Sequence, residues 1–178
     1  VSGDDGPGTG PAPAQLRNPR RSRSRPRAPP LAPIRRRARD PPVRPGGPRP
    51  AEIAIPGPGQ ESVWSYPRPP RLDLCPHPVH IDFAGERIAS TTRALRLLET
   101  SHPPTYYIPP ADVHLARLER APGASMCEWK GQAAYWTVRL GNRVAERAAW
   151  SYPDPFPEFS ALRDHLAFYC AAMDACFV

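Results

Sequence analysis

Apolar and polar residues alternate most clearly in two stretches of the chain. Residues 79–83 (VHIDF) have a period of two, which predicts a half-buried strand, and Gly85-Glu86 then turns the chain into a second strand over 87–92. A similar unit runs over 133–140, turns at Gly141-Asn142 and continues over 143–146. These patterns predict two β-hairpins.

Two short helices and two final strands complete the predicted elements. Pro110 suits the first turn of a helix that continues through Leu118. After Pro157, a stripe formed by Phe159, Leu162 and Leu166 has helical spacing and is interpreted as core. Residues 165–170 and 174–178 are expected to be strands. The predicted class is mainly β, antiparallel, with two short helices at its edges.

Composition divides the chain at residue 60. Of the 178 residues, the first 60 hold 12 arginines and four acidic residues, a net charge of +8, with 15 of the 28 prolines. All 15 aromatic residues and all four cysteines lie in 61–178, whose net charge is −1. We expect residues 1–60 to be a disordered tail rich in Pro, Arg and Gly, and 61–178 to be a single β-rich domain. Such a tail is a solvated leader or associates non-specifically with nucleic acid through its phosphates.

No stretch of the sequence has the length of a signal peptide core or a membrane span. The longest apolar run near the arginines, residues 31–34, is short and contains proline. We therefore expect a cytoplasmic protein with reduced thiols and no membrane partner. A disulfide between Cys170 and Cys176 would not be favoured there. The sequence does not indicate the oligomeric state.

Lys130 is the most informative candidate for chemistry. It is the only lysine in a chain with 23 arginines, which suggests a position where a compact ammonium group is needed. It follows Cys127 by three residues, and a nearby ammonium favours the thiolate of a cysteine. The alternative is a tight turn in which Cys127 is a small core residue and Lys130 is solvated.

Other candidate groups give weaker patterns. Glu99 and His102 would serve as acid and base if the fold brings them to Cys127; otherwise they belong to a proline-stiffened loop. Cys75, His77 and His80 resemble a metal cluster, but a structural zinc site needs a fourth ligand and the chain has no Cys-x-x-Cys pair. We predict no metal and no cofactor. Phosphate-binding glycine loops and the Gly-x-Ser-x-Gly motif are also absent from the sequence.

One six-residue pattern occurs twice. Trp64-Ser65-Tyr66-Pro67-x-Pro69 recurs as Trp150-Ser151-Tyr152-Pro153-x-Pro155, 86 residues later. The two hairpins share a Gly-x-Arg-aliphatic-Ala pattern, but at an offset of 56 residues. Because the offsets differ, the chain is not a simple duplication.

Three segments carry a resemblance to a known family. Residues 99–113 (ETSHPPTYYIPPADV), 127–138 (CEWKGQAAYWTV) and 144–155 (VAERAAWSYPDP) are similar to the bacterial domain-of-unknown-function family 427. The segments 61–72 and 167–178 resemble its longer members, so the similarity covers 61–178 and none of the tail. Cys170 departs from the family pattern, which often has proline there.

The resemblance implies a small antiparallel β fold of the Mss4-like or β-tent type. Relatives with that architecture often hold zinc between two Cys-x-x-Cys knuckles, which this chain lacks, so metal is not carried over. A nucleotidyltransferase label is attached to the family, without support from the motifs above. The matched polar positions are Glu99, Tyr107, Cys127, Lys130, Tyr135, Trp150 and Tyr152.

These observations leave several functions open. In the first, the domain acts on or binds a small molecule, with Cys127 as nucleophile or redox centre and Lys130 and Glu99 beside it; Tyr107, Tyr135, Trp150 and Tyr152 contact the ligand. In the second, the domain is a non-catalytic protein- or ligand-binding module with an aromatic groove formed by Trp129, Trp136, Trp150 and Tyr152. A nucleotidyltransferase-like activity is a further alternative. Whether the protein is an enzyme is not decided by the sequence.

Overall fold

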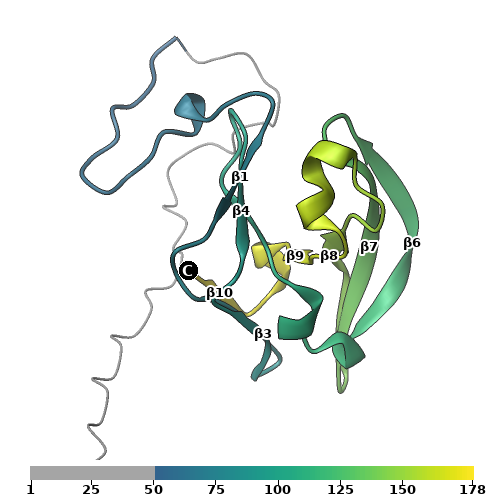
Figure 1. Ribbon diagram of the computed structural model, residues 1–178. Helices are drawn as coiled ribbons and strands as arrows, with labels where there is room; N and C mark the ends of the chain where they lie inside the picture. Colours follow the sequence, from purple (N-terminus) through teal and green to yellow (C-terminus); the bar gives the residue numbers. More distant parts are fainter. Residues whose placement is uncertain (1–50) are drawn as a thin grey trace, which may run out of the picture. The chain divides into compact units, whose positions relative to one another are not determined.

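The computed structural model describes residues 51–178, so most of the predicted tail lies outside the described residues. The domain is mainly β, as predicted, with ten strands in three small antiparallel sheets in this range. The first sheet has the order β1-β4-β5: Arg71–Leu74, Leu95–Leu98 and Thr105–Tyr107. The second has the order β10-β2-β3: Ala175–Phe177, Val79–Phe83 and Glu86–Thr91. The third has the order β6-β7-β8-β9: Leu118–Cys127, Gly131–Leu140, Arg143–Ser151 and Ala167–Phe168 (Figure 1).

Both predicted hairpins are confirmed. Phe83 at the end of β2 pairs with Glu86 at the start of β3, so the turn is Ala84-Gly85, one residue earlier than expected. Both turn residues have positive φ, 53° and 80°, as the tight two-residue turns that suit twisted strands require. Strands β7 and β8 join through Gly141, whose φ is 55°.

The predicted helices are replaced by short segments of 3₁₀-helix. The expected helix over 110–118 is replaced by η2 (Pro110–Asp112) and η3 (Leu115–Arg117). Between them, Val113 forms a bridge with Ala89, and His114 N donates to the Ile88 carbonyl, so contacts with β3 interrupt the helical pattern. The other 3₁₀ segments are η1 (Val63–Ser65), η4 (Pro157–Leu162), which is kinked at Phe159, and η5 (Cys170–Ala172).

The apolar stripe after Pro157 is core, as predicted. Phe159 and Leu162 are buried in η4, and Leu166 is buried just beyond it, where it pairs with Ile108. The final strands are shorter than expected, since only β9 and β10 are extended within 165–170 and 174–178.

The ten-residue strand β6 was not predicted from the sequence. Its register with β7 shifts between Arg120 and Ala124, where Pro122 and Gly123 form an irregularity. Gly123 has a φ of 85°, and Arg147 Nη1 donates to the Pro122 carbonyl at 2.7 Å. Two residues that usually end a strand therefore lie inside a β-bulge.

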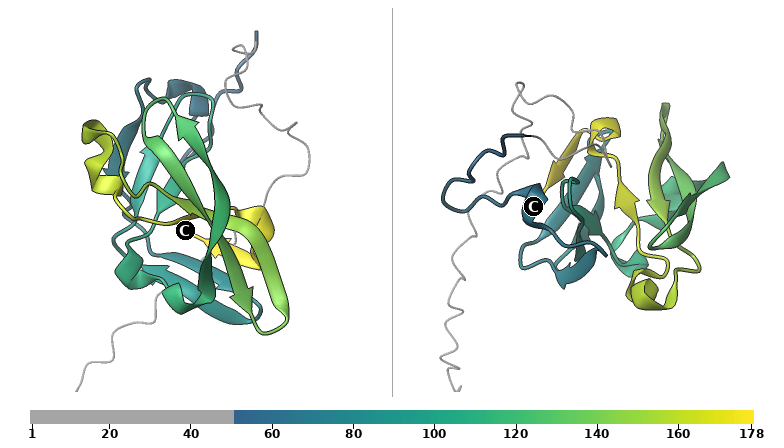
Figure 2. Two further views of the ribbon diagram at one scale, coloured as in Figure 1. Left: turned by 90° about the vertical axis from the view of Figure 1, so that its right-hand side faces the viewer. Right: turned by 90° about the horizontal axis from the view of Figure 1, so that it is seen from above.

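The core consists of two clusters of buried side chains. The larger one lies around β2, β3 and the middle of β7 and β8, with Phe83, Ile88 and Val138 nearly inaccessible. The smaller one includes Leu97, Tyr107, Tyr152, Phe159 and Leu162, from β4, β5, the end of β8 and η4. Figures 1 and 2 show the blue-teal strands of the first two sheets on one side and the green β6–β7 hairpin on the other. In residues 51–178 no helix is long and apolar enough to cross a membrane.

The sheet β1-β4-β5 separates two groups of polar residues. Leu95 pairs with Tyr107 and Arg96 pairs with Tyr106, and directly opposed residues share one face of an antiparallel sheet. Because successive side chains point to opposite faces, Tyr107 enters the smaller core cluster while Tyr106 and Arg96 line a cavity.

Candidate functional site

The tip of the β6–β7 hairpin positions the predicted cysteine and lysine. Cys127 pairs with Gly131, and the three residues between them form a turn that Gly131 closes with a φ of 90°. A β-carbon on Gly131 would lie 3.4 Å from the Asp154 carbonyl oxygen, so a side chain there is both strained and crowded.

The two motifs that carried the family resemblance pack against each other at this tip. Gly131 forms a bridge with Pro155, and the backbone N–H of Phe156 donates to the Lys130 carbonyl at 3.3 Å. The Cys-x-Trp-Lys-Gly turn is therefore held by the segment that follows Trp150-Ser151-Tyr152, which gives a physical reason for finding both motifs in one sequence.

Lys130 is buried and forms an ion pair with Glu99. The Nζ to Oε2 distance is 3.6 Å, and the side chains of Lys130 and Glu99 are only 6% and 14% exposed. Glu99 directly follows β4, so it is brought to the hairpin tip by a different sheet. Removing two charges from water carries a desolvation penalty that an imperfect pair does not fully offset. Such a pair is a candidate functional group because burial for stability alone would favour apolar residues.

A chain of aromatic groups joins this pair to Cys127. The Lys130 ammonium lies 6.0 Å from the centre of the Tyr152 ring, which is 6.3 Å from the Tyr107 ring, and Cys127 packs against the core cluster that contains both tyrosines. Trp150 Nε1 donates to the Tyr107 hydroxyl at 3.3 Å. The structure thus brings together six of the seven predicted site residues.

The tyrosines of this cluster stay protonated. Burial raises the pKa of Tyr107 well above its ordinary value of 10, and burial together with the nearby Tyr107 and Cys127 raises that of Tyr152 further. Each hydroxyl therefore acts as a neutral hydrogen-bonding group in the cluster at neutral pH.

Tyr135 and His102 are not part of the cluster. The Tyr135 hydroxyl is 2.7 Å from Ser125 Oγ, and its ring is covered by the Arg147 guanidinium at 4.0 Å. His102 Nδ1 lies 3.0 Å from the Thr100 carbonyl and 3.5 Å from Ser101 Oγ. The predicted pairing of Glu99 with His102 as acid and base at Cys127 is not formed; Lys130 is the partner of Glu99.

In the Cys-Pro-His-Pro-Val-His segment, residues 75–78 connect β1 to β2, and Val79 and His80 are the first residues of β2. The Cys75 thiol donates to the His77 carbonyl at 3.4 Å, and His80 Nδ1 lies 3.0 Å from Ser90 Oγ. Among the described residues, no group of three or more His, Cys, Asp or Glu side chains is arranged to hold a metal ion.

A cavity of about 620 Å³ lies beside Trp129, the residue before Lys130, and Glu99, Cys127 and Lys130 are not among its lining residues. Trp129, Phe156, Phe159 and Leu72 line it together with Pro69 and Pro70. Its charged lining residues are Arg71, Glu128 and Glu158, of which Glu128 is paired with Arg68. Trp129 and Phe159 also pack in the core cluster that contains Tyr107 and Tyr152. Trp129 Nε1 is buried and has no hydrogen-bond partner within residues 51–178.

The aromatic residues predicted to form one groove occupy separate positions. Trp129 lines the 620 Å³ cavity, whereas Trp150 stacks on Tyr169 at 4.5 Å and lines a different cavity of about 100 Å³. Trp136 Nε1 donates to Ser151 Oγ at 3.0 Å. Of the four residues predicted to form the groove, Trp129 is therefore the one that lines the 620 Å³ cavity.

Comparison with known families explains the shared motifs. Residues 71–178 match the model of a family described as a domain of unknown function, DUF427. The chain belongs to this family. The matched range contains Glu99, Cys127, Lys130 and Tyr152, whereas the first Trp-Ser-Tyr-Pro-x-Pro segment lies before it. No curated protein gives a significant match to the sequence.

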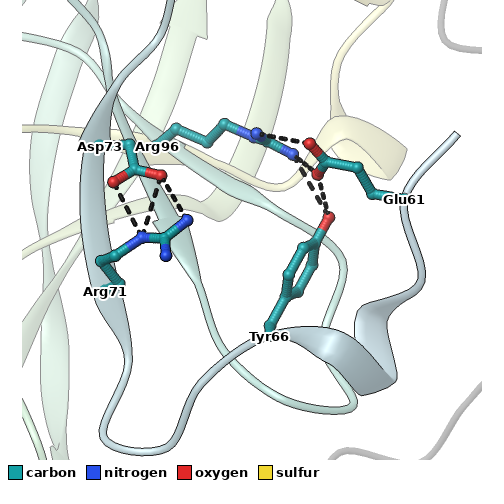
Figure 3. Close-up of polar contacts among 5 residues, drawn as sticks. All are labelled: Glu61, Tyr66, Arg71, Asp73 and Arg96. Atoms are coloured by element: carbon teal, nitrogen blue, oxygen red, sulfur yellow. Dashed lines mark hydrogen bonds and ion pairs between the residues drawn. The ribbon is translucent and has the colours of Figure 1, made fainter. Parts of the chain in front are cut away.

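A second polar cluster, on the other face of the β1-β4-β5 sheet, was missed by sequence reasoning. Arg96 on β4 binds the Glu61 carboxylate through both terminal nitrogens, and the Tyr66 hydroxyl donates to Glu61 Oε2 at 2.7 Å (Figure 3). Arg71 and Asp73 of β1 form a neighbouring pair at 3.0 Å. The repeated six-residue pattern could have indicated this cluster, because Tyr66 in its first copy corresponds to Tyr152 in its second copy.

Proposed function

We propose that this domain binds a small molecule whose body occupies the Trp129 cavity and whose polar end reaches Glu99, Lys130 and Cys127. Tyr107, Trp150 and Tyr152 support these groups from behind. In the catalytic form of this proposal, Cys127 is the nucleophile or redox centre.

The buried Glu99–Lys130 pair carries the proposal. It lies where two sheets and two family motifs meet, and its neighbour Tyr152 packs in one core cluster with Trp129 and Phe159, which line the cavity. A ligand with a hydrogen-bond acceptor would also satisfy Trp129 Nε1, whose buried donor has no partner in the described range. Concave, mainly apolar sites with a few convergent polar groups are typical of small-molecule binding.

Thermal-shift screening of the full chain against a panel of small metabolites tests this proposal. Ligands that raise the melting temperature should lose most of that effect in Trp129→Phe, which removes the indole donor, and in Lys130→Met. Arg139→Met, which removes an exposed ion pair with Glu119 at 2.9 Å, serves as the control and should keep the effect. Ligands that stabilise both site variants as well as the parent protein would contradict the proposal.

The second candidate is a non-catalytic binding module. The exposed Phe156 beside Trp129, Pro69 and Pro70 favours it, because this groove needs no reactive thiol. Cys127→Ser distinguishes the two, since a module keeps its ligand affinity whereas a cysteine enzyme loses turnover.

A nucleotidyltransferase-like activity is a further alternative, and it rests on the family label alone. It predicts Mg²⁺-dependent turnover of a nucleoside triphosphate that Lys130→Met abolishes. The Mss4-like or β-tent type of fold and the cytoplasmic location also stay predictions.

A further inference from the structure

We propose a second ligand site, for a small organic cation with an apolar body, in the cavity bounded by Glu61, Tyr66 and Arg96. This cavity has a volume of about 960 Å³ and lies on the face of the β1-β4-β5 sheet opposite Tyr107. One wall is residues 52–66 and the other includes Cys75, His77 and Tyr106. The first wall lies before the residues that match the family.

The charge of the cavity favours a cation. The guanidinium of Arg96 is engaged with Glu61, so its charge is compensated inside the pair. Glu52, which also lines the cavity, has no ion-pair partner among the described residues, and the Glu and Arg side chains of the lining sum to a net charge of −1. Hydrogen bonds from Arg96 and Tyr66 lower the pKa of Glu61, so this carboxylate remains ionised at neutral pH.

The uncharged lining favours an apolar or aromatic body. Trp64, Tyr66 and Tyr106 contribute three aromatic side chains, and rings of this kind attract cations as well as packing against apolar groups. Burial and the bond to Glu61 raise the pKa of Tyr66 to about 12, so its hydroxyl stays a neutral donor. One feature favours an anion instead: Arg96 Nε is buried without a hydrogen-bond partner in residues 51–178.

The repeated six-residue pattern gives independent support. Its two copies place Tyr66 and Tyr152 beside a carboxylate–cation pair, Glu61 with Arg96 and Glu99 with Lys130. The second copy adjoins the site proposed above, and the first copy adjoins the 960 Å³ cavity. The same local device thus serves two faces of one sheet.

Three probes of the same shape and different charge test the proposal on the full chain. Benzamidine is a cation, benzamide is neutral and benzoate is an anion, so the ring is held constant while the charge changes. Binding is followed through the indole N–H signal of Trp64 in two-dimensional NMR, assigned with Trp64→Phe, and the other three tryptophans act as internal controls. With about nine non-hydrogen atoms, benzamidine should bind with a dissociation constant on the order of 1 mM.

We expect benzamidine to shift the Trp64 signal saturably, benzamide to do so more weakly and benzoate not at all. Glu52→Gln, at an exposed position, should weaken benzamidine binding about fivefold, as the loss of one partly screened charge would. Glu61→Gln should weaken benzamidine binding at least as much. Glu119→Gln, which changes an exposed ion pair on β6, should leave benzamidine binding unchanged. Any of three results would overturn the proposal. Benzoate binds saturably and benzamidine does not; or benzamidine gives no response at a concentration 10-fold above its expected dissociation constant; or Glu52→Gln binds benzamidine with unchanged affinity.

The source of the cation is decided by a second comparison. N-acetyl-arginine amide represents a free small molecule, and acetyl-Pro-Arg-Pro-amide represents an arginine within a peptide. Equal affinities assign the site to free cations, whereas peptide binding about tenfold tighter assigns it to arginine-containing chains. Failure of both while benzamidine binds would restrict the site to aromatic amines and amidines.

Discussion

The two faces of the β1-β4-β5 sheet carry similar groups in opposite environments. On one face, Lys130 and Glu99 are largely buried, and Tyr107 and Tyr152 pack in the smaller core cluster together with Cys127. On the other, the Glu61 side chain is 51% exposed and Arg96 is 19% exposed, beside a large cavity. The difference shows that burial, more than residue type, decides how large a desolvation penalty a carboxylate–cation pair carries.

The largest effect is expected from breaking the buried pair. Glu99→Gln or Lys130→Met leaves one charge uncompensated in the core, so each should lower the free energy of unfolding by about 3 kcal/mol. The double variant removes both charges and should recover much of that loss. Urea denaturation of the parent, the two single variants and the double variant measures the coupling free energy between the two side chains. If the loss in the double variant equals the sum of the two single losses, the side chains do not act as a pair.

The glycine that holds the hairpin tip gives the next largest effect. Gly131→Ala forces an alanine to a φ of 90° and places its β-carbon against the Asp154 carbonyl, so we expect a loss of about 2–3 kcal/mol. Gly85→Ala is the matched control, since its φ is 80° but nothing lies within 4 Å of the added carbon. Its loss should be about 1 kcal/mol, measured by the same denaturation. Equal losses at the two sites would mean that contact between the two family motifs adds nothing.

The exposed pair should contribute least. Arg96→Met breaks a pair whose carboxylate is half exposed to water, so the expected loss is below about 1 kcal/mol at physiological salt. A loss as large as that of Lys130→Met would remove the contrast between the two faces.

The pH dependence of stability should also distinguish the exposed pair. Because Arg96 and Tyr66 lower the pKa of Glu61, the contribution of this carboxylate is complete above 4.5 and is lost as the pH falls through its lower folded-state pKa. The raised pKa of Tyr66 acts in the opposite direction: its contribution is complete below pH 10 and is lost as the pH rises through about 12. Thermal melts of the parent and of Tyr66→Phe across both windows test this, and the variant should lose the part of the alkaline decline that belongs to Tyr66. An identical alkaline decline would contradict it.

The sequence predicted those parts of the fold in which local pattern and tertiary packing agree. The β2–β3 and β7–β8 hairpins have clear alternation and glycine turns, and both were found. Strand β6 was not, because Pro122 and Gly123 lie in a bulge whose partner, Arg147, is distant in sequence. The helix expected after Pro110 gave way to pairing with β3, again a contact that local propensity does not contain.

The candidate site was partly predictable for a similar reason. Cys127, Lys130 and Tyr152 lie in short motifs that contact each other, and the single lysine among many arginines singled out the buried cation. That Glu99 would be its partner, and not His102, depended on the packing of two sheets. Tyr135 belongs to the same motif as Lys130, yet its side chain contacts Ser125 and Arg147 instead.

The most direct test of the proposed site compares alkylation of Cys127 by iodoacetate and iodoacetamide, which differ mainly in charge. Mass spectrometry of the native full chain gives both rates, with the exposed Cys170 as internal reference. If Lys130 and Glu99 face a ligand that reaches Cys127, the iodoacetate-to-iodoacetamide ratio at Cys127 should fall several-fold in Lys130→Met and rise in Glu99→Gln, relative to Cys170. A Cys127 that reacts only after unfolding, or a ratio that neither variant changes, would contradict the account.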